Sequence, residues 1–110
     1  MRRYSNTKFI RQMDIRGSDL IEIFYKKHAD VFEPLAVWVN FVEKAQWKNH
    51  SDLKTDFPSA DYVGKRRYVF NIKGNNYRLV AIVVFFEGVI DIRFVGTHAE
   101  YDKIKDIENI

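Results

Sequence analysis

The sequence predicts an α+β fold in which two N-terminal helices pack on a small, mainly antiparallel, twisted sheet that is followed by a short helix. Two observations favour this fold class. Apolar residues recur at helical spacing between residues 18 and 47, and three segments after residue 66 are rich in β-branched and aromatic residues and separated by very short turns. Because 110 residues can bury one hydrophobic core and not two, we expect residues 13–110 to form a single domain.

Residues 1–12 show neither periodicity nor a turn signal, and we expect them to be an N-terminal extension outside the domain. The alternative is an ordered segment that packs on the domain. Four of the 18 basic residues lie in this segment, and without them the chain has 14 basic and 15 acidic residues, so the net charge falls from +3 to −1. An argument for nucleic-acid binding must therefore rest on where the charges lie and not on their sum.

Composition excludes several classes of protein. The longest apolar run, residues 79–86, is much shorter than the roughly 20 residues of a membrane helix. The basic N-terminus leads into no apolar stretch like that of a secretory signal. The absence of cysteine excludes disulfides and thiolate metal sites. We therefore expect a soluble protein of the reducing cytoplasm.

The first half of the chain is predicted to be mainly helical. Residues 13–16 can form a short edge strand, after which Ser18 is a suitable N-cap for the first helix. A second helix is expected over residues 34–47, since its proline lies in the first turn, where proline is tolerated. The polar, turn-rich segment 49–62 leaves room for one short helix at residues 51–56.

The second half of the chain is predicted to form the sheet. The period changes to that of strands over residues 67–73, 77–86 and 89–95. Gly96 is expected to end the last strand, and residues 99–107 can form the closing helix.

The turns between these strands determine which side chains share a face of the sheet. A two-residue loop at residues 74–75 pairs Asn71 with Arg78, and a two-residue loop in the second hairpin pairs Phe85 with Ile90. One face is then wholly apolar, and we expect the two helices to cover it. Its residues are Tyr68, Phe70, Ile72, Tyr77, Leu79, Ala81, Val83, Phe85, Ile90, Ile92 and Phe94.

The opposite face collects polar side chains among a few valines and one isoleucine. These polar residues are Asn71, Lys73, Arg78, Asp91 and Arg93. Extending the second hairpin places Thr97 opposite Arg78, so that His98 and Tyr101 fall near the same guanidinium. A cationic cluster with a histidine and a tyrosine is suited to binding a phosphate.

Each of these residues also has a purely structural interpretation. Arg78 can pair with Asp91 or Glu100 instead of clamping a phosphate and stabilising charge in a transition state. Asp91 can equally neutralise Arg93. His98 stands at a helix start, where a histidine can be structural, and beside Arg78 it can also act as a general acid or base near neutral pH.

A basic run leads into the first strand of the predicted sheet. Such a run is usually solvated surface, but near a phosphate site it can hold nucleic-acid backbone with little sequence preference. The candidates for RNA binding are Lys54, Lys65, Arg66, Arg67, Asn71, Asn76 and Tyr101, the tyrosine as a stacking surface that the core can also claim.

Other chemistries find no support in the sequence. The three histidines are far apart and show no ligand spacing, so we expect no metal site. A phosphate-cradling glycine-rich loop and a nucleophile elbow are also missing. We expect no cofactor.

Three strings look like those of the HigB toxins, a family within the RelE-like toxins of type II toxin–antitoxin systems. They are VFNIKGN at residues 69–75, YRLV at residues 77–80 and IRFVGTHAEYD at residues 92–102. The likeness covers roughly residues 13–107, and family members usually begin near Met13. It implies a RelE-like fold for the domain.

The resemblance implies a ribosome-dependent mRNA endoribonuclease that inhibits translation. It implies cleavage without a metal ion, in which the ribose 2′-hydroxyl attacks the adjacent phosphate. The implied partners are mRNA, the ribosome and a HigA-type antitoxin with a helix-turn-helix domain, with DNA contacted only through the antitoxin.

The same resemblance suggests roles for individual residues. Arg78 matches the arginine of the Tyr-Arg-Leu-Val strand in RelE-like enzymes, and Tyr101 matches a tyrosine of their closing segment. Where RelE carries a further arginine after the last strand, this chain has His98, with Arg93 nearby. We assign His98 as acid or base, Arg78 and Arg93 as phosphate stabilisers, and Lys73 as an alternative base or clamp.

Two other functions fit the same fold. ParE toxins resemble RelE in fold but inhibit DNA gyrase and do not cut RNA. A binding module that blocks translation without cleavage is the second alternative. The presence of Arg78, His98 and Tyr101 favours the nuclease, because a gyrase inhibitor needs no general acid.

Overall fold

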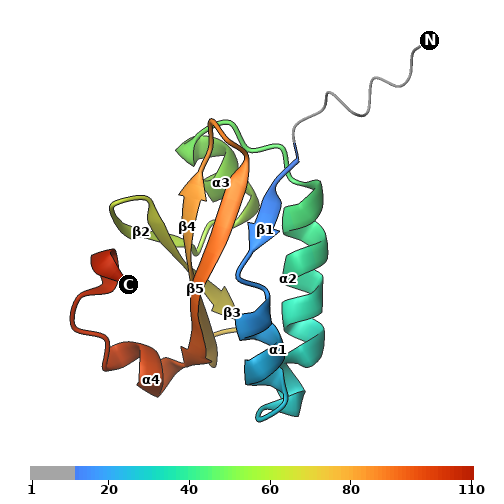
Figure 1. Cartoon of the computed structure of the whole chain (residues 1–110), viewed down its shortest axis with the longest axis vertical. Helices are drawn as coiled ribbons and strands as arrows, with labels where there is room; N and C mark the ends of the chain where they lie inside the picture. The colour runs from blue at the N-terminus through green and yellow to red at the C-terminus, as the bar shows by residue number, and fades with distance from the viewer. Residues whose placement is uncertain (1–11) are drawn as a thin grey trace.

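The computed structural model describes residues 12–110, and Figure 1 shows their arrangement. Its elements are β1 (Asp14–Arg16), α1 (Asp19–Tyr25), η2 (Ala29–Val31), α2 (Phe32–Lys44), α3 (His50–Asp56), β2 (Asp61–Gly64), β3 (Arg67–Ile72), β4 (Tyr77–Val84), β5 (Val89–Thr97), α4 (His98–Asp102) and η3 (Ile107–Asn109). The predicted α+β class is confirmed. Within residues 12–110, five strands form one sheet in the order β1-β5-β4-β3-β2, in which only β1 and β5 are parallel. The predicted extension, apart from its last residue, lies outside the described residues.

Several boundaries differ from those predicted. The segment 49–62 contains not only α3 but also the start of β2, a strand that its turn-rich composition did not indicate. Helix α2 begins and ends earlier than the predicted 34–47. The closing helix predicted over 99–107 ends at Asp102, and the chain then turns back beside the strands to η3, which contacts β2.

The hydrophobic core lies between one face of the sheet and helices α1, α2 and α3. The Phe70 ring is the centre of this layer, because it makes edge contacts with both Trp38 of α2, at 5.3 Å between centroids, and Phe57 after α3, at 5.2 Å. Leu79 and Ile90 pack on the same face and are fully buried. Each such side chain contributes roughly 1.5–3 kcal/mol to folding.

The β3–β4 hairpin has the predicted register, with Asn71 opposite Arg78. The β4–β5 hairpin does not, because Val84 pairs with Val89 and the chain already turns at Phe85. The backbone N–H of Gly88 donates to the Phe85 carbonyl at 3.1 Å, and Gly88 has a positive φ of 67°. The predicted pairing of Phe85 with Ile90 is therefore wrong by two residues, a shift that keeps the faces unchanged.

A bulge in β5 then changes the faces. Ile92 pairs with Ala81 and Phe94 pairs with Val80, so that Arg93 stands as the extra residue between them. Phe94 consequently lies on the outer face with Arg78, and its predicted place in the core is wrong. The predicted pairing of Thr97 with Arg78 is also wrong, because Gly96 takes that position.

Candidate functional site

Arg78 lies on the outer face of the sheet, the face away from α1 and α2. Its guanidinium donates to Asn75 twice, through Nη2 to the side-chain oxygen at 2.6 Å and through Nη1 to the carbonyl at 3.1 Å. The residue is only 9% exposed. The two carboxylates considered as its partners are engaged elsewhere, Asp91 with Arg93 and Glu100 with the backbone of Thr97. Arg78 therefore keeps its charge without an ion pair among the described residues.

Helix α4 is held against Arg78 by its first turn. The Thr97 hydroxyl accepts from the Glu100 N–H at 3.1 Å, and the Glu100 carboxylate accepts from the Thr97 N–H at 2.8 Å, which forms a capping box. The latter hydrogen bond is the main cause that lowers the pKa of Glu100 below its ordinary value. One turn later the Tyr101 ring lies 5.9 Å from the guanidinium carbon of Arg78, and burial raises the pKa of Tyr101.

His98 joins this group through the turn between β3 and β4. Its backbone N–H donates to the Asn76 carbonyl at 3.1 Å, next to the Asn75 residue that binds Arg78. Its Nδ1 lies 2.9 Å from the Asp102 carboxylate, one helical turn further on. A carboxylate on Nδ1 orients the ring and leaves Nε2 for proton transfer. We call the cluster of Asn75, Arg78, His98, Tyr101 and Asp102 the Arg78 site.

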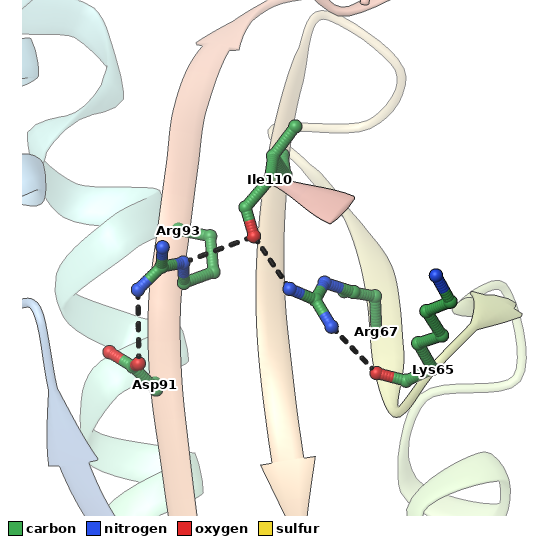
Figure 2. A network of polar contacts seen from close by, with 5 residues as sticks. All are labelled: Lys65, Arg67, Asp91, Arg93 and Ile110. Atoms are coloured by element: carbon green, nitrogen blue, oxygen red, sulfur yellow. Dashed lines mark hydrogen bonds and ion pairs between the residues drawn. The ribbon is translucent and has the colours of Figure 1, made fainter. Parts of the chain in front are cut away.

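Arg93 is not part of the Arg78 site. The bulge carries its side chain to Asp91, whose carboxylate lies 3.4 Å from Nη1, and to the backbone oxygen of Ile110, which accepts from Nε at 3.2 Å. Figure 2 shows that the Ile110 oxygen also receives a hydrogen bond from Arg67. The structure therefore does not bring Arg93 into contact with Arg78 or His98, and its role as a phosphate stabiliser stays a prediction.

Lys73 is also placed elsewhere. Its backbone φ is +52°, a left-handed conformation that takes it out of the strand, and its Nζ lies 2.8 Å from Asp30. The Tyr77 hydroxyl donates to the same carboxylate. The hydrogen bond to Asp30 raises the pKa of Lys73 and, reciprocally, lowers that of Asp30. A lysine held in its protonated form is not suited to act as a base at neutral pH, whereas a phosphate clamp needs that form, so the role of Lys73 as a clamp stays a prediction.

The basic run divides among several structural tasks. Lys54 donates to the carbonyls of Pro58 and Ala60, so it closes the end of α3. Lys65 binds Asn109 at 2.8 Å, and Arg67 donates to the Lys65 carbonyl and to Ile110. Arg66 lies over the Phe86 ring at 5.6 Å. The further candidates Asn71, opposite Arg78, and Asn76, in the adjoining turn, lie beside the Arg78 site.

Two residues of the Arg78 site are not identified in the sequence analysis. Asp102 follows His98 by four residues, a helical spacing that brings the two side chains onto one face and was a usable signal. Asn75 was read only as a turn residue. Between residues 12 and 110, no group of three or more histidine, aspartate and glutamate side chains is arranged to hold a metal ion. In the same part of the chain, no helix is long and apolar enough to cross a membrane.

A second feature with histidine lies near the opposite end of strands β3 and β4. A hollow of about 390 Å³ is lined by Arg66 and by aromatic rings that include Tyr62 and Phe85. In its wall His50 Nδ1 lies 2.7 Å from the Tyr68 hydroxyl. This hollow shares no residue with the Arg78 site.

Comparisons with known proteins agree with the strings noted in the sequence. Over 66 residues the chain is 46% identical to the mRNA interferase toxin HigB of Escherichia coli K12 and to the mRNA interferase HigB of Shigella flexneri. It is 29% identical over 65 residues to the mRNA interferase HigB of Escherichia coli CFT073. The first alignments cover 57% of this chain and 62% of those relatives, so the chain spans about three fifths of their length. The HigB toxin model, which describes the RelE-like toxic component of a toxin–antitoxin system, matches residues 32–104. The chain therefore belongs to the HigB toxin family.

Proposed function

We propose that this chain is the toxin of a type II toxin–antitoxin system and cleaves mRNA on the ribosome, by attack of a ribose 2′-hydroxyl on the adjacent phosphate. The observation that carries the proposal is the Arg78 site, where a buried guanidinium that forms no ion pair with the described residues contacts the Tyr101 ring. The helix that carries this ring begins at His98, whose imidazole is oriented by the Asp102 carboxylate. Relatives named mRNA interferases support the reaction class. The toxin domain comprises residues 13–110, acts in the cytoplasm, and is silenced by a HigA-type helix-turn-helix antitoxin that provides the only contact with DNA.

The Arg78 site supplies what this reaction needs. The attack forms a bond from the 2′ oxygen to phosphorus and breaks the bond from phosphorus to the 5′ oxygen, which leaves a 2′,3′-cyclic phosphate. On the way the phosphorus is pentacoordinate with extra negative charge, which a guanidinium stabilises through charge-assisted hydrogen bonds. The 5′ oxygen that leaves needs a proton, and the attacking 2′-hydroxyl must lose one. His98, through Nε2, exchanges one of these protons, and Asp102 fixes the orientation of the ring. Tyr101, beside Arg78, offers a ring face to a base next to the scissile phosphate.

Primer extension on mRNA from cells that express the protein tests the proposal. The unmodified protein should produce discrete cleavage sites, and Arg78→Ala and His98→Ala should abolish them while the purified variants stay folded. Arg16→Ala is the matched control, because Arg16 is exposed on β1 and paired with Asp14. Growth arrest with intact transcripts, or a defect in DNA supercoiling, would instead establish a translation-blocking or gyrase-inhibiting toxin of the same fold.

A further inference from the structure

Two guanidinium groups meet over the outer face of the sheet, away from the Arg78 site. Arg67 belongs to β3 and Arg93 to β5, the two strands that flank β4. Arg67 pairs with Ile82, which on its other side pairs with Asp91, so the two arginines approach the same row of the sheet from both sides. Figure 2 shows them converging on one oxygen, that of Ile110, at 2.8 Å from Arg67 and 3.2 Å from Arg93.

The oxygen that this arginine pair holds uses only part of the pair's hydrogen-bonding capacity. The Ile110 oxygen receives one N–H from each guanidinium, and Asp91 partly neutralises Arg93 at 3.4 Å. Among the described residues, the buried Nε of Arg67 has no hydrogen-bond partner. A phosphate group offers several oxygens and full negative charge to the planar, forked donors of two arginines. A phosphate can therefore fill donors of the pair, such as Nε of Arg67, that the Ile110 oxygen leaves without a partner among the described residues.

The segment that supplies this oxygen is attached to the sheet by few polar contacts. The 3₁₀ turn Ile107–Asn109 is three residues long. Asn109 links it to Lys65 and to Asp106, each at 2.8 Å and each at an exposed position. Segments held by exposed hydrogen bonds belong to the part of a protein that opens most readily. Residues 107–110 can therefore leave the arginine pair without unfolding the core.

We propose that Arg67 and Arg93 form a binding site for a backbone phosphate of single-stranded RNA, which residues 107–110 occupy in the free protein and which RNA takes by displacing them. This inference rests on the proposed function, since the phosphate is that of the RNA substrate. The site is a backbone contact and not a catalytic one. Residues 107–110 thereby act as an internal competitor that lowers the affinity of the free protein for RNA.

Binding of a fluorescent, single-stranded 12-mer with 2′-deoxyribose tests the inference, because the probe cannot be cleaved. Deletion of residues 107–110 should tighten binding about tenfold if the segment occupies the site about nine tenths of the time. One added phosphate contact should also steepen the dependence of log K on log salt by about 0.7. In a chain that carries Arg67→Gln and Arg93→Gln, the same deletion should change neither quantity.

Two further variants separate the release of the arginine pair from the change in charge and the loss of stability that the deletion can also cause. Glu108→Gln alone reproduces the charge change of the deletion, and it should leave affinity near that of the unmodified chain. Asn109→Ala loosens the segment without changing the net charge, and like the deletion it should tighten binding of the probe. If the deletion variant does not fold, the affinity of Asn109→Ala tests the inference in its place. Unchanged affinity in both the deletion and Asn109→Ala, or an equal gain in the Arg67→Gln, Arg93→Gln background, would overturn the inference. Tighter binding without mRNA cleavage by the unmodified chain would refute the nuclease proposal alone.

Discussion

Replacing Thr97 by alanine should destabilise the protein and reduce cleavage more than the loss of stability explains. The substitution removes the hydroxyl that accepts from the Glu100 N–H at 3.1 Å, one of the two hydrogen bonds of the capping box. Loss of such a cap costs about 1 kcal/mol, within a range of 0.5–2, which for a domain near 100 residues lowers Tm by roughly 4–6 °C. Helix α4 has only five residues, so the loosened turn carries His98 and Tyr101 with it.

Thermal unfolding followed by circular dichroism measures the change in Tm. Primer extension, at a temperature where both proteins are folded, measures the change in mRNA cleavage. Thr97→Ser is the matched control, because serine retains the accepting oxygen and should restore both stability and cleavage. If Thr97→Ala has an unchanged Tm while cleavage falls, the hydroxyl acts on substrate and not as a cap. If Tm falls as expected and cleavage is unaffected, the orientation of α4 does not matter for the reaction.

Three further predictions concern charge and packing. Asp30 and Glu100 have folded-state pKa values below their ordinary ones. Their stabilising contribution is therefore complete above roughly pH 5 and is lost as the pH falls through the folded-state values. The urea midpoint of unfolding should accordingly fall between pH 7 and pH 3, and it should fall less steeply in Glu100→Gln. Lys73→Met should leave the cleavage pattern intact and make stability less sensitive to acid, because Asp30 then loses the main cause of its lowered pKa; loss of cleavage in a folded variant would establish Lys73 as a phosphate clamp. Phe70 is only 1% exposed, so Phe70→Ala leaves a cavity in the core and should lower the free energy of unfolding, measured in urea, by about 3–5 kcal/mol. A loss below about 1 kcal/mol would mean that Trp38 refills the cavity.

The sequence predicted well what short-range chemistry determines. Gly74 and Asn75 specify a tight turn, and the pairing of Asn71 with Arg78 follows from it, as the structure confirms. This one register already places Arg78 on the face opposite the helices, because side chains alternate along a strand. The prediction that Tyr101 lies near Arg78 did not need the exact pairing of β4 with β5. Thr97 caps the helix directly after β5, and this limits how far the Tyr101 ring can lie from the strand.

One error arose from an unrecognised local turn, and the others arose where a contact between distant residues outweighs the local pattern. Phe85 continues an apolar run and looks like strand, yet the chain turns there because the backbone of Gly88 closes the loop. The left-handed backbone of Lys73 turns its side chain to Asp30, which is 43 residues away in the sequence. The periodicity of the apolar residues cannot predict a contact of this kind. The contacts of Arg67 and Arg93 with Ile110 are likewise between segments that are remote in the sequence.

The bulge at Arg93 connects these errors with the chemistry of the Arg78 site. By inserting one residue into β5, it moves Phe94 onto the outer face and places Gly96 opposite Arg78. A side chain at position 96 would meet the Phe94 ring at 2.4 Å and the Glu100 carboxylate at 3.0 Å, so a larger residue would force the ring and the carboxylate to shift. Without the bulge, the observed turn would place Val95 opposite Arg78, and α4 would begin one position further from the guanidinium. The extra residue thus performs two tasks, because it removes one arginine from the Arg78 site and makes room for the helix that brings the histidine to it.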